Sequence, residues 1–225
     1  LGNIVTGNDK QTQVVLRAGA LPALRSMLVH QKKSIRKEAC WTISNITAGN
    51  KEQIQAVIAA GIIGPLVAML RNAQFDVKKE ACWAIANAIS GGSSKQLEYI
   101  FSQSVIEPLS LLFKCHDPKM VMIALEAMEK ILAHGATRGA GAFGGEKENK
   151  CAECLEECGG LDLIEDLQRH DNEEIYEKAV KILRDYFESD DADDDENTFA
   201  APAVDANAGQ FAFGGGFGGG EEFTF

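Results

Sequence analysis

The stretch "RKEACWTISNITAGN" at residues 36–50 is written a second time, with few changes, as "KKEACWAIANAISGG" at residues 78–92. Equivalent residues are 42 positions apart, so that Trp41 corresponds to Trp83 and Asn45 to Asn87. A duplication this close indicates a chain assembled from repeated units. Because a missed repeat misassigns the whole fold, the length and content of the unit come first.

The unit extends beyond the duplicated stretch. One amphipathic helix is written three times, as "GALPALRSML" (19–28), "GIIGPLVAML" (61–70) and "SVIEPLSLLF" (104–113), and a fourth copy, "GGLDLIEDLQ" (159–168), follows. Each unit has a short helix, this second helix and a longer third helix. A period of about 40–47 residues is typical of armadillo or HEAT repeats, and glycine at the first bend favours armadillo. We predict an all-α, right-handed armadillo-repeat superhelical solenoid, stabilised by contacts between neighbouring units.

The predicted domains are a solenoid at 1–187 and a tail at 188–225. Within the solenoid we expect the end of a truncated repeat at 1–13, full repeats at about 14–50, 51–92, 93–135 and 150–187, and a Gly-rich loop at 136–149. The tail contains ten Asp and Glu and no Lys or Arg, so of the net charge of −11 only about −1 belongs to the solenoid. Its acidic block and glycine runs predict disorder.

One side of the third helix carries residues that stacking does not require. The stripe occurs twice, at i, i+3 and i+7, as Glu38, Trp41 and Asn45 and as Glu80, Trp83 and Asn87. An asparagine amide both donates and accepts, which matches a peptide backbone. Neighbouring indoles form walls along which a lysine or arginine gains about 0.5–2 kcal/mol of cation–π attraction, and glutamates meet the cationic heads. The duplication favours a binding surface for an extended Lys/Arg-rich peptide over ordinary packing.

These strings, together with "LGNIVTGNDKQTQVV" at residues 1–15, resemble the C-terminal part of the importin-α (karyopherin-α) family, over about residues 1–187. The resemblance implies a non-enzymatic nuclear import adaptor that binds nuclear localisation signals and shuttles between cytoplasm and nucleus. It implies that the chain is a fragment retaining the family's minor peptide site. Importin-β would bind an N-terminal segment absent here, and a CAS-type export receptor and a nucleoporin would bind the last repeats.

The resemblance also implies which residues contact the peptide. They are Asn3, Val5, Thr6, Asp9, Thr12, Glu38, Trp41, Ser44, Asn45, Glu80, Trp83 and Asn87. In the third unit the places of tryptophan and asparagine are assigned to Leu125 and Glu129, and in the fourth to Val180 and Arg184. Without Trp or Asn at these places, we expect the row of Trp and Asn side chains that binds the peptide to end after the second unit.

Two alternatives remain open. A β-catenin-like armadillo scaffold would bind acidic partners and would present rows of Lys and Arg. A metal or redox protein would use Cys151, Cys154 and Cys158, but a fourth ligand is not evident. We therefore expect no metal and no cofactor, and the scattered histidines give no support for an enzyme. No apolar run approaches the roughly 18–20 residues of a membrane span, and the basic residues before the third helices are interpreted as solvated turns. We expect neither a membrane nor a nucleic-acid partner.

Overall fold

The computed structural model describes residues 2–5, 7, 9–139 and 149–187. These residues lie within one compact unit, Leu1–Glu188. The predicted disordered tail at 188–225 and most of the predicted Gly-rich loop, residues 140–148, lie outside the described residues. Throughout the described ranges the secondary structure is helical, without strands.

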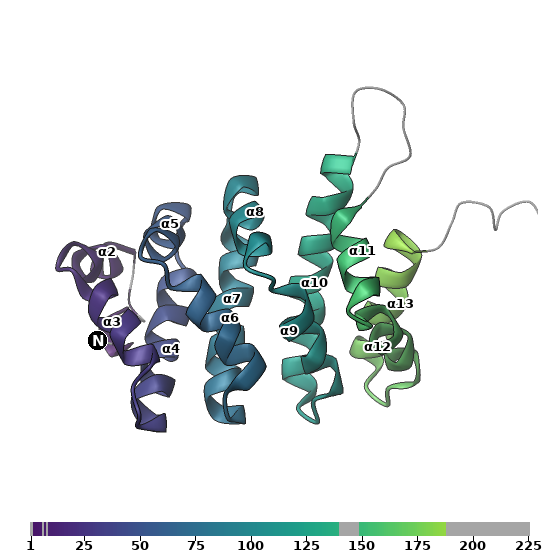
Figure 1. The fold of residues 1–225 in the computed structure, drawn as a ribbon, viewed down its shortest axis with the longest axis horizontal. Helices are drawn as coiled ribbons and strands as arrows, with labels where there is room; N and C mark the ends of the chain where they lie inside the picture. Colours follow the sequence, from purple (N-terminus) through teal and green to yellow (C-terminus); the bar gives the residue numbers. More distant parts are fainter. Residues whose placement is uncertain (1, 6, 8, 140–148, 188–225) are drawn as a thin grey trace, which may run out of the picture. The chain divides into compact units, whose positions relative to one another are not determined.

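Four successive units of three helices stack side by side, preceded by the short helix α1 (Gly2–Val5) (Figure 1). The first unit is α2 (Asp9–Arg17), α3 (Ala20–Leu28) and α4 (Lys33–Thr47), and the second is α5 (Lys51–Ala59), α6 (Ile63–Asn72) and α7 (Phe75–Gly91). The third is α8 (Ser94–Ser102), α9 (Ile106–Ser110) with η1 (Leu111–Lys114), and α10 (Pro118–Gly139). The fourth is α11 (Lys150–Glu157), α12 (Gly160–Asp166) with η2 (Leu167–Arg169), and α13 (Glu173–Tyr186). The predicted solenoid of three-helix units is confirmed. Helix α10 continues through Gly139, into the segment expected to be loop.

The bend between the first and second helix of each unit needs a left-handed backbone. Gly19, Gly61 and Gly159 adopt φ values of 77°, 66° and 70° at this point. The third unit places Ser104 there, with φ at 55°. Glycine suits the bend because it lacks the Cβ that makes this conformation cost about 1–2 kcal/mol in other residues. The third unit therefore carries local strain that the other three avoid.

Buried glutamines join the first helices of successive units. Gln53 completes the capping box of α5, and its amide nitrogen donates to the carbonyl of Asp9 in α2 at 3.0 Å. Gln96 does the same for α8 and donates to the carbonyl of Lys51 in α5 at 2.8 Å. Both side chains are almost fully buried. One residue type thus caps its own helix and fixes it to the unit before.

The third helices form a continuous row, in which α1 contacts α4, α4 contacts α7, α7 contacts α10 and α10 contacts α13. Their inward sides supply much of the apolar core, including the buried residues Ile43, Ile85, Met128 and Leu183. We call the solvent-facing side of α1, α4, α7, α10 and α13 the third-helix face. In the described part of the chain, no single helix is long and apolar enough to cross a membrane, and α5 with α6 meets those criteria only as a pair bent by 80°.

Candidate peptide-binding face

Both predicted stripes lie on neighbouring helices of the row, α4 and α7. Trp41 and Asn45 on α4 are half-buried, as are Trp83 and Asn87 on α7. The residues beside them that point inward are fully buried, as Cys40 is next to Trp41. The helices are therefore turned so that apolar packing uses one side and leaves the indoles and amides in partial contact with solvent.

Trp83 borders a cleft of about 370 Å³ between α7 and α10. Asn87 and Ser90 line it from α7, and Glu126 and Lys130 line it from α10. The ammonium nitrogen of Lys119, at the start of α10, lies 5.4 Å from the centroid of the Trp83 ring. A cation within about 6 Å of an indole centroid is attracted by the ring quadrupole. The Trp83 ring thus already contacts an ammonium, which is the group that the sequence predicts for a ligand.

The two asparagines of the stripes differ in their hydrogen bonds. The Asn87 amide nitrogen donates to the carbonyl of Ser44 on α4 at 3.0 Å. This bond orients the amide, and its oxygen accepts no hydrogen bond from the residues that the structure describes. The amide nitrogen of Asn45 is buried and finds no partner among the described residues. The Asn87 oxygen is an acceptor that matches a peptide N–H, whereas the Asn45 nitrogen is a buried donor without a partner among the described residues.

The acidic members of the stripes are Glu38, which is exposed, and Glu80, which is half-buried. Burial raises the pKa of Glu80 above the usual range of a glutamate, while Lys37 and Lys79 lower it and the charge of Glu38 raises it. The carboxylates of Glu38 and Glu80 therefore repel each other across neighbouring helices. A cationic ligand near both would relieve this repulsion and offset the cost of burying Glu80.

The N-terminal part of the predicted site starts on α1. Asn3 is exposed there, and Gly2 packs against the Trp41 ring so closely that an added Cβ would lie 2.0 Å from indole Cζ3. Glycine is required at this close approach because any side chain would displace the indole. Helix α1 therefore supports one side of Trp41.

Three other predicted contacts have buried side chains, namely Val5 at 3%, Thr12 at 3% and Ser44 at 5% exposure. The Ser44 hydroxyl donates to the carbonyl of Trp41 at 2.8 Å, so it serves its own helix. Asp9 is exposed at the start of α2, and its carboxylate accepts from the Asn50 amide at 3.4 Å. Thr6 lies outside the described residues.

The assignment of the tryptophan and asparagine places in the third unit to Leu125 and Glu129 is wrong by one residue. Leu125 is fully buried, whereas Glu126, Glu129 and Lys130 line the cleft beside the α7 stripe. Buried Ala124 and Leu125 match buried Ala81 and Cys82 at a spacing of 43. The N-cap residues Asn50 of α5 and Ser93 of α8 are 43 positions apart, because the segment from Asn87 to Ser93 is one residue longer than the segment from Asn45 to Asn50. The places therefore belong to Glu126 and Lys130. The spacing of 43 between Leu66 and Leu109 already carried this signal.

The same shift applies to the fourth unit, which follows the third at a spacing of 55 residues. Buried Ala124 on α10 corresponds to buried Ala179 on α13. The tryptophan and asparagine places thus belong to Lys181 and Asp185, not to Val180 and Arg184. In both units charged residues occupy these places.

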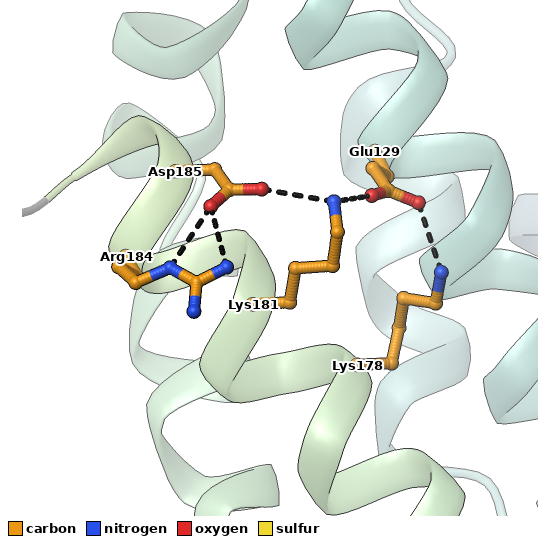
Figure 2. Close-up of polar contacts among 5 residues, drawn as sticks. All are labelled: Glu129, Lys178, Lys181, Arg184 and Asp185. Carbon is orange, nitrogen blue, oxygen red and sulfur yellow. Dashed lines mark hydrogen bonds and ion pairs between the residues drawn. The ribbon is translucent and has the colours of Figure 1, made fainter.

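An ion-pair network covers the third-helix face between α10 and α13 (Figure 2). Glu129 accepts from Lys178 at 2.9 Å and also from Lys181, which bridges to Asp185 at 2.8 Å. Arg184 pairs with Asp185 at 3.0 Å. Burial alone would raise the pKa of Glu129, but its two lysine partners lower it below the usual range. The carboxylate of Glu129 is therefore already paired with two lysines of this chain.

Three of the cysteines, Cys40, Cys82 and Cys151, are buried. Burial raises the pKa of Cys40 and of Cys82 to about 12, and that of Cys151 to about 11. Thiols with such pKa values stay protonated and unreactive at neutral pH. No group of three or more His, Cys, Asp or Glu is arranged to hold a metal within the described residues.

Comparison with known proteins adds family relationships to this geometry. The armadillo/β-catenin-like repeat model matches residues 8–48 and 50–90, and the atypical Arm repeat model matches residues 149–201. The chain is 52% identical over 198 residues to importin subunit alpha-1b of Oryza sativa subsp. japonica, covering 85% of this chain and 36% of that protein. It is 50% identical over 222 residues to importin subunit alpha-3 of Arabidopsis thaliana, covering 95% of this chain and 41% of that protein.

A solved structure is also similar. It is a designed armadillo repeat protein in complex with the peptide (KR)4, which is 31% identical with a TM-score of 0.58, covering 82% of this chain and 89% of that one. The chain spans 36% and 41% of the length of the two importin-α relatives.

Proposed function

This chain is built from armadillo repeats and is a homologue of the importin-α subunits, and from that premise we propose that it is a nuclear import adaptor whose third-helix face binds extended Lys/Arg-rich nuclear localisation peptides. The adaptor would act in both cytoplasm and nucleus. The export receptor and the nucleoporin would bind the last repeats, and importin-β would bind a segment outside this chain.

The observation that carries the proposal is the environment of Trp83. Its indole is accessible at a cleft, stands beside an asparagine whose oxygen accepts from no described residue, and contacts an ammonium group. The first two features are what an extended cationic peptide requires at one Trp/Asn pair, and the ammonium contact supports the choice of a cation as the group that packs on the ring. The designed relative with the peptide (KR)4 supports the choice of ligand, since its own fold holds a chain of alternating lysine and arginine.

Binding would proceed without covalent chemistry. The amides of Asn45 and Asn87 would hold the ligand backbone, and the indoles of Trp41 and Trp83 would pack along cationic side-chain stems. Glu38 and Glu80 would supply opposite charge, as charge-assisted hydrogen bonds are about twice as strong as neutral ones. Because Asn contacts the backbone and Trp contacts the stems, the face would select charge and extension more than one sequence.

A titration of the 225-residue chain tests the proposal. A fluorescein-labelled (KR)4 peptide should bind and a (DE)4 peptide of equal length should not, as measured by anisotropy at low salt. Trp83→Ala should weaken (KR)4 binding, whereas Phe75→Ala, which removes an exposed aromatic from the same helix, should leave it unchanged. Preference for (DE)4 would instead support an armadillo scaffold for acidic partners and reject the import proposal.

A further inference from the structure

The side of Trp83 that faces α10 is already occupied by a cation of this chain. Lys119 is the second residue of α10, and its ammonium lies 5.4 Å from the Trp83 ring centroid. Trp83 is only half-buried, so the ring surface that Lys119 covers is a surface that a ligand would otherwise reach. The contact has the geometry expected of a bound lysine side chain.

The backbone of Lys119 is held in this position from two directions. The Asp117 carboxylate accepts from the backbone nitrogens of Lys119 at 3.1 Å and of Met120 at 3.4 Å, which caps the start of α10. Its other oxygen accepts from Lys79 on α7 at 3.0 Å. Lys79 and Trp83 are one turn apart on α7. The same helix that presents the indole thus anchors the loop that delivers the ammonium.

Beyond Trp83 the third-helix face loses the residues that attract a cationic chain. Glu126 and Lys130 replace the tryptophan and the asparagine, so one added cation accompanies the added carboxylate. Glu129 also lines the cleft, but two lysines use its carboxylate. A ligand cation entering the cleft would therefore meet Lys130 and Lys178 in its lining, with only Glu126 left unpaired among the described acidic residues there. At the Trp83 ring it would also meet Lys119.

We propose that Lys119 determines ligand specificity by taking the place of a ligand cation on the α10-facing side of Trp83. The cationic part of a bound peptide therefore ends at Trp83. The inference rests on the proposed function. It predicts where the Lys/Arg-rich part of the bound peptide ends on the third-helix face. A peptide with a cation past Trp83 would have to displace Lys119, so the new cation–π contact would only replace the existing one.

Two variants separate the ammonium of Lys119 from its stem. Lys119→Met keeps the unbranched stem and removes the charge, and Lys119→Arg keeps a cation. Each is titrated with (KR)4 and with eight peptides that carry one alanine each. In the parent chain the residue beyond Trp83 should tolerate alanine. In Lys119→Met this residue should become sensitive, with (KR)4 affinity raised about twofold to thirtyfold, the range expected for one cation–π contact.

Controls distinguish this effect from a change in net charge. Lys114→Met removes an exposed lysine outside the cleft and should leave the alanine profile as in the parent. Lys119→Arg should also match the parent. If the parent binds (KR)4 and Lys119→Met shows the parent's alanine profile, the inference is overturned while the proposed function stands. If the parent binds no basic peptide, the proposed function fails and the inference fails with it.

The contact itself is measurable without peptide. The chain has two tryptophans, so in Trp41→Phe all indole emission comes from Trp83. Adding Lys119→Met to this background should change the emission and increase quenching by acrylamide, because the ring loses its cover. Identical spectra and quenching with and without the lysine would show that the ammonium does not cover the ring, which contradicts the inference.

Discussion

Replacing Asn87 with alanine separates the contribution of its amide to stability from its contribution to ligand binding. The amide nitrogen donates one hydrogen bond, to the Ser44 carbonyl, across the junction of α4 and α7. That carbonyl also accepts from the backbone nitrogen of Ala48 at 3.0 Å and from the Thr47 hydroxyl at 3.1 Å. It is therefore not left unsatisfied in Asn87→Ala. The loss of unfolding free energy should be that of one ordinary hydrogen bond, about 0.5–1.5 kcal/mol.

The loss in binding should be larger than the loss in stability. An asparagine that clamps an extended backbone makes two hydrogen bonds to it, so its removal should cost about 1–3 kcal/mol, or about fivefold to 150-fold in Kd. Urea unfolding followed by circular dichroism gives the first quantity, and anisotropy with labelled (KR)4 gives the second. Asn72→Ala, at an exposed position on α6, is the matched control for both.

Unchanged affinity in Asn87→Ala would refute the role of this amide in the binding face. A loss of stability above about 3 kcal/mol would refute the structural part of the argument, since it would exceed what one replaceable hydrogen bond contributes.

Three further predictions concern pH, backbone strain and the junctions between units. The raised pKa of Glu80 means that peptide affinity should fall as pH drops through a range above that of an ordinary glutamate; Glu80→Gln should weaken binding and flatten this profile in anisotropy titrations. Ser104→Gly should stabilise the chain by about 0.5–1 kcal/mol, because relief of left-handed strain outweighs the added freedom of the unfolded chain. In Gly159→Ala the new Cβ would meet no atom within 4 Å, so only the backbone strain should destabilise the chain, by about 1–2 kcal/mol in urea unfolding. Equal stability of the parent, Ser104→Gly and Gly159→Ala would contradict the assignment of strain. Gln96→Ala removes a helix cap and the bond to the Lys51 carbonyl and should cost about 1–3 kcal/mol, whereas a neutral effect would show that this junction depends on apolar contacts alone.

The sequence is sufficient to predict the fold because the first two complete units have very similar sequences. A spacing of 42 between Trp41 and Trp83 identified the third helices, and the glycines at the first bends identified where the second helices begin. The same spacing then failed in the third unit. Helix α7 ends later than α4, and counting residues from Trp83 placed buried Leu125 on the solvent side. Helix caps are better reference points than a fixed period, since they mark where each helix physically starts.

Other features of the face depend on side-chain positions that no spacing encodes. Lys119 is 36 residues from Trp83 in the sequence, and an exposed lysine is ordinarily interpreted as solvent-facing. Its contact requires the relative placement of α7 and α10 and the anchoring of Asp117. The pairing of Glu129 with two lysines is likewise a property of neighbouring helices. Sequence patterns assign residues to a face, whereas contacts across the face arise only when the helices are placed.

Three amides that join successive units in the described part of the chain point in one direction along it. Gln53 and Gln96 donate to carbonyls of the preceding unit, and Asn149, which caps α11, donates to the Leu132 carbonyl of the preceding unit at 3.0 Å. Those carbonyls belong to helices, where backbone partners remain if the next unit is removed. At each of these junctions the following unit therefore supplies the donor and the preceding unit the acceptor, so a substitution that removes the amide breaks the bond without altering the unit before it.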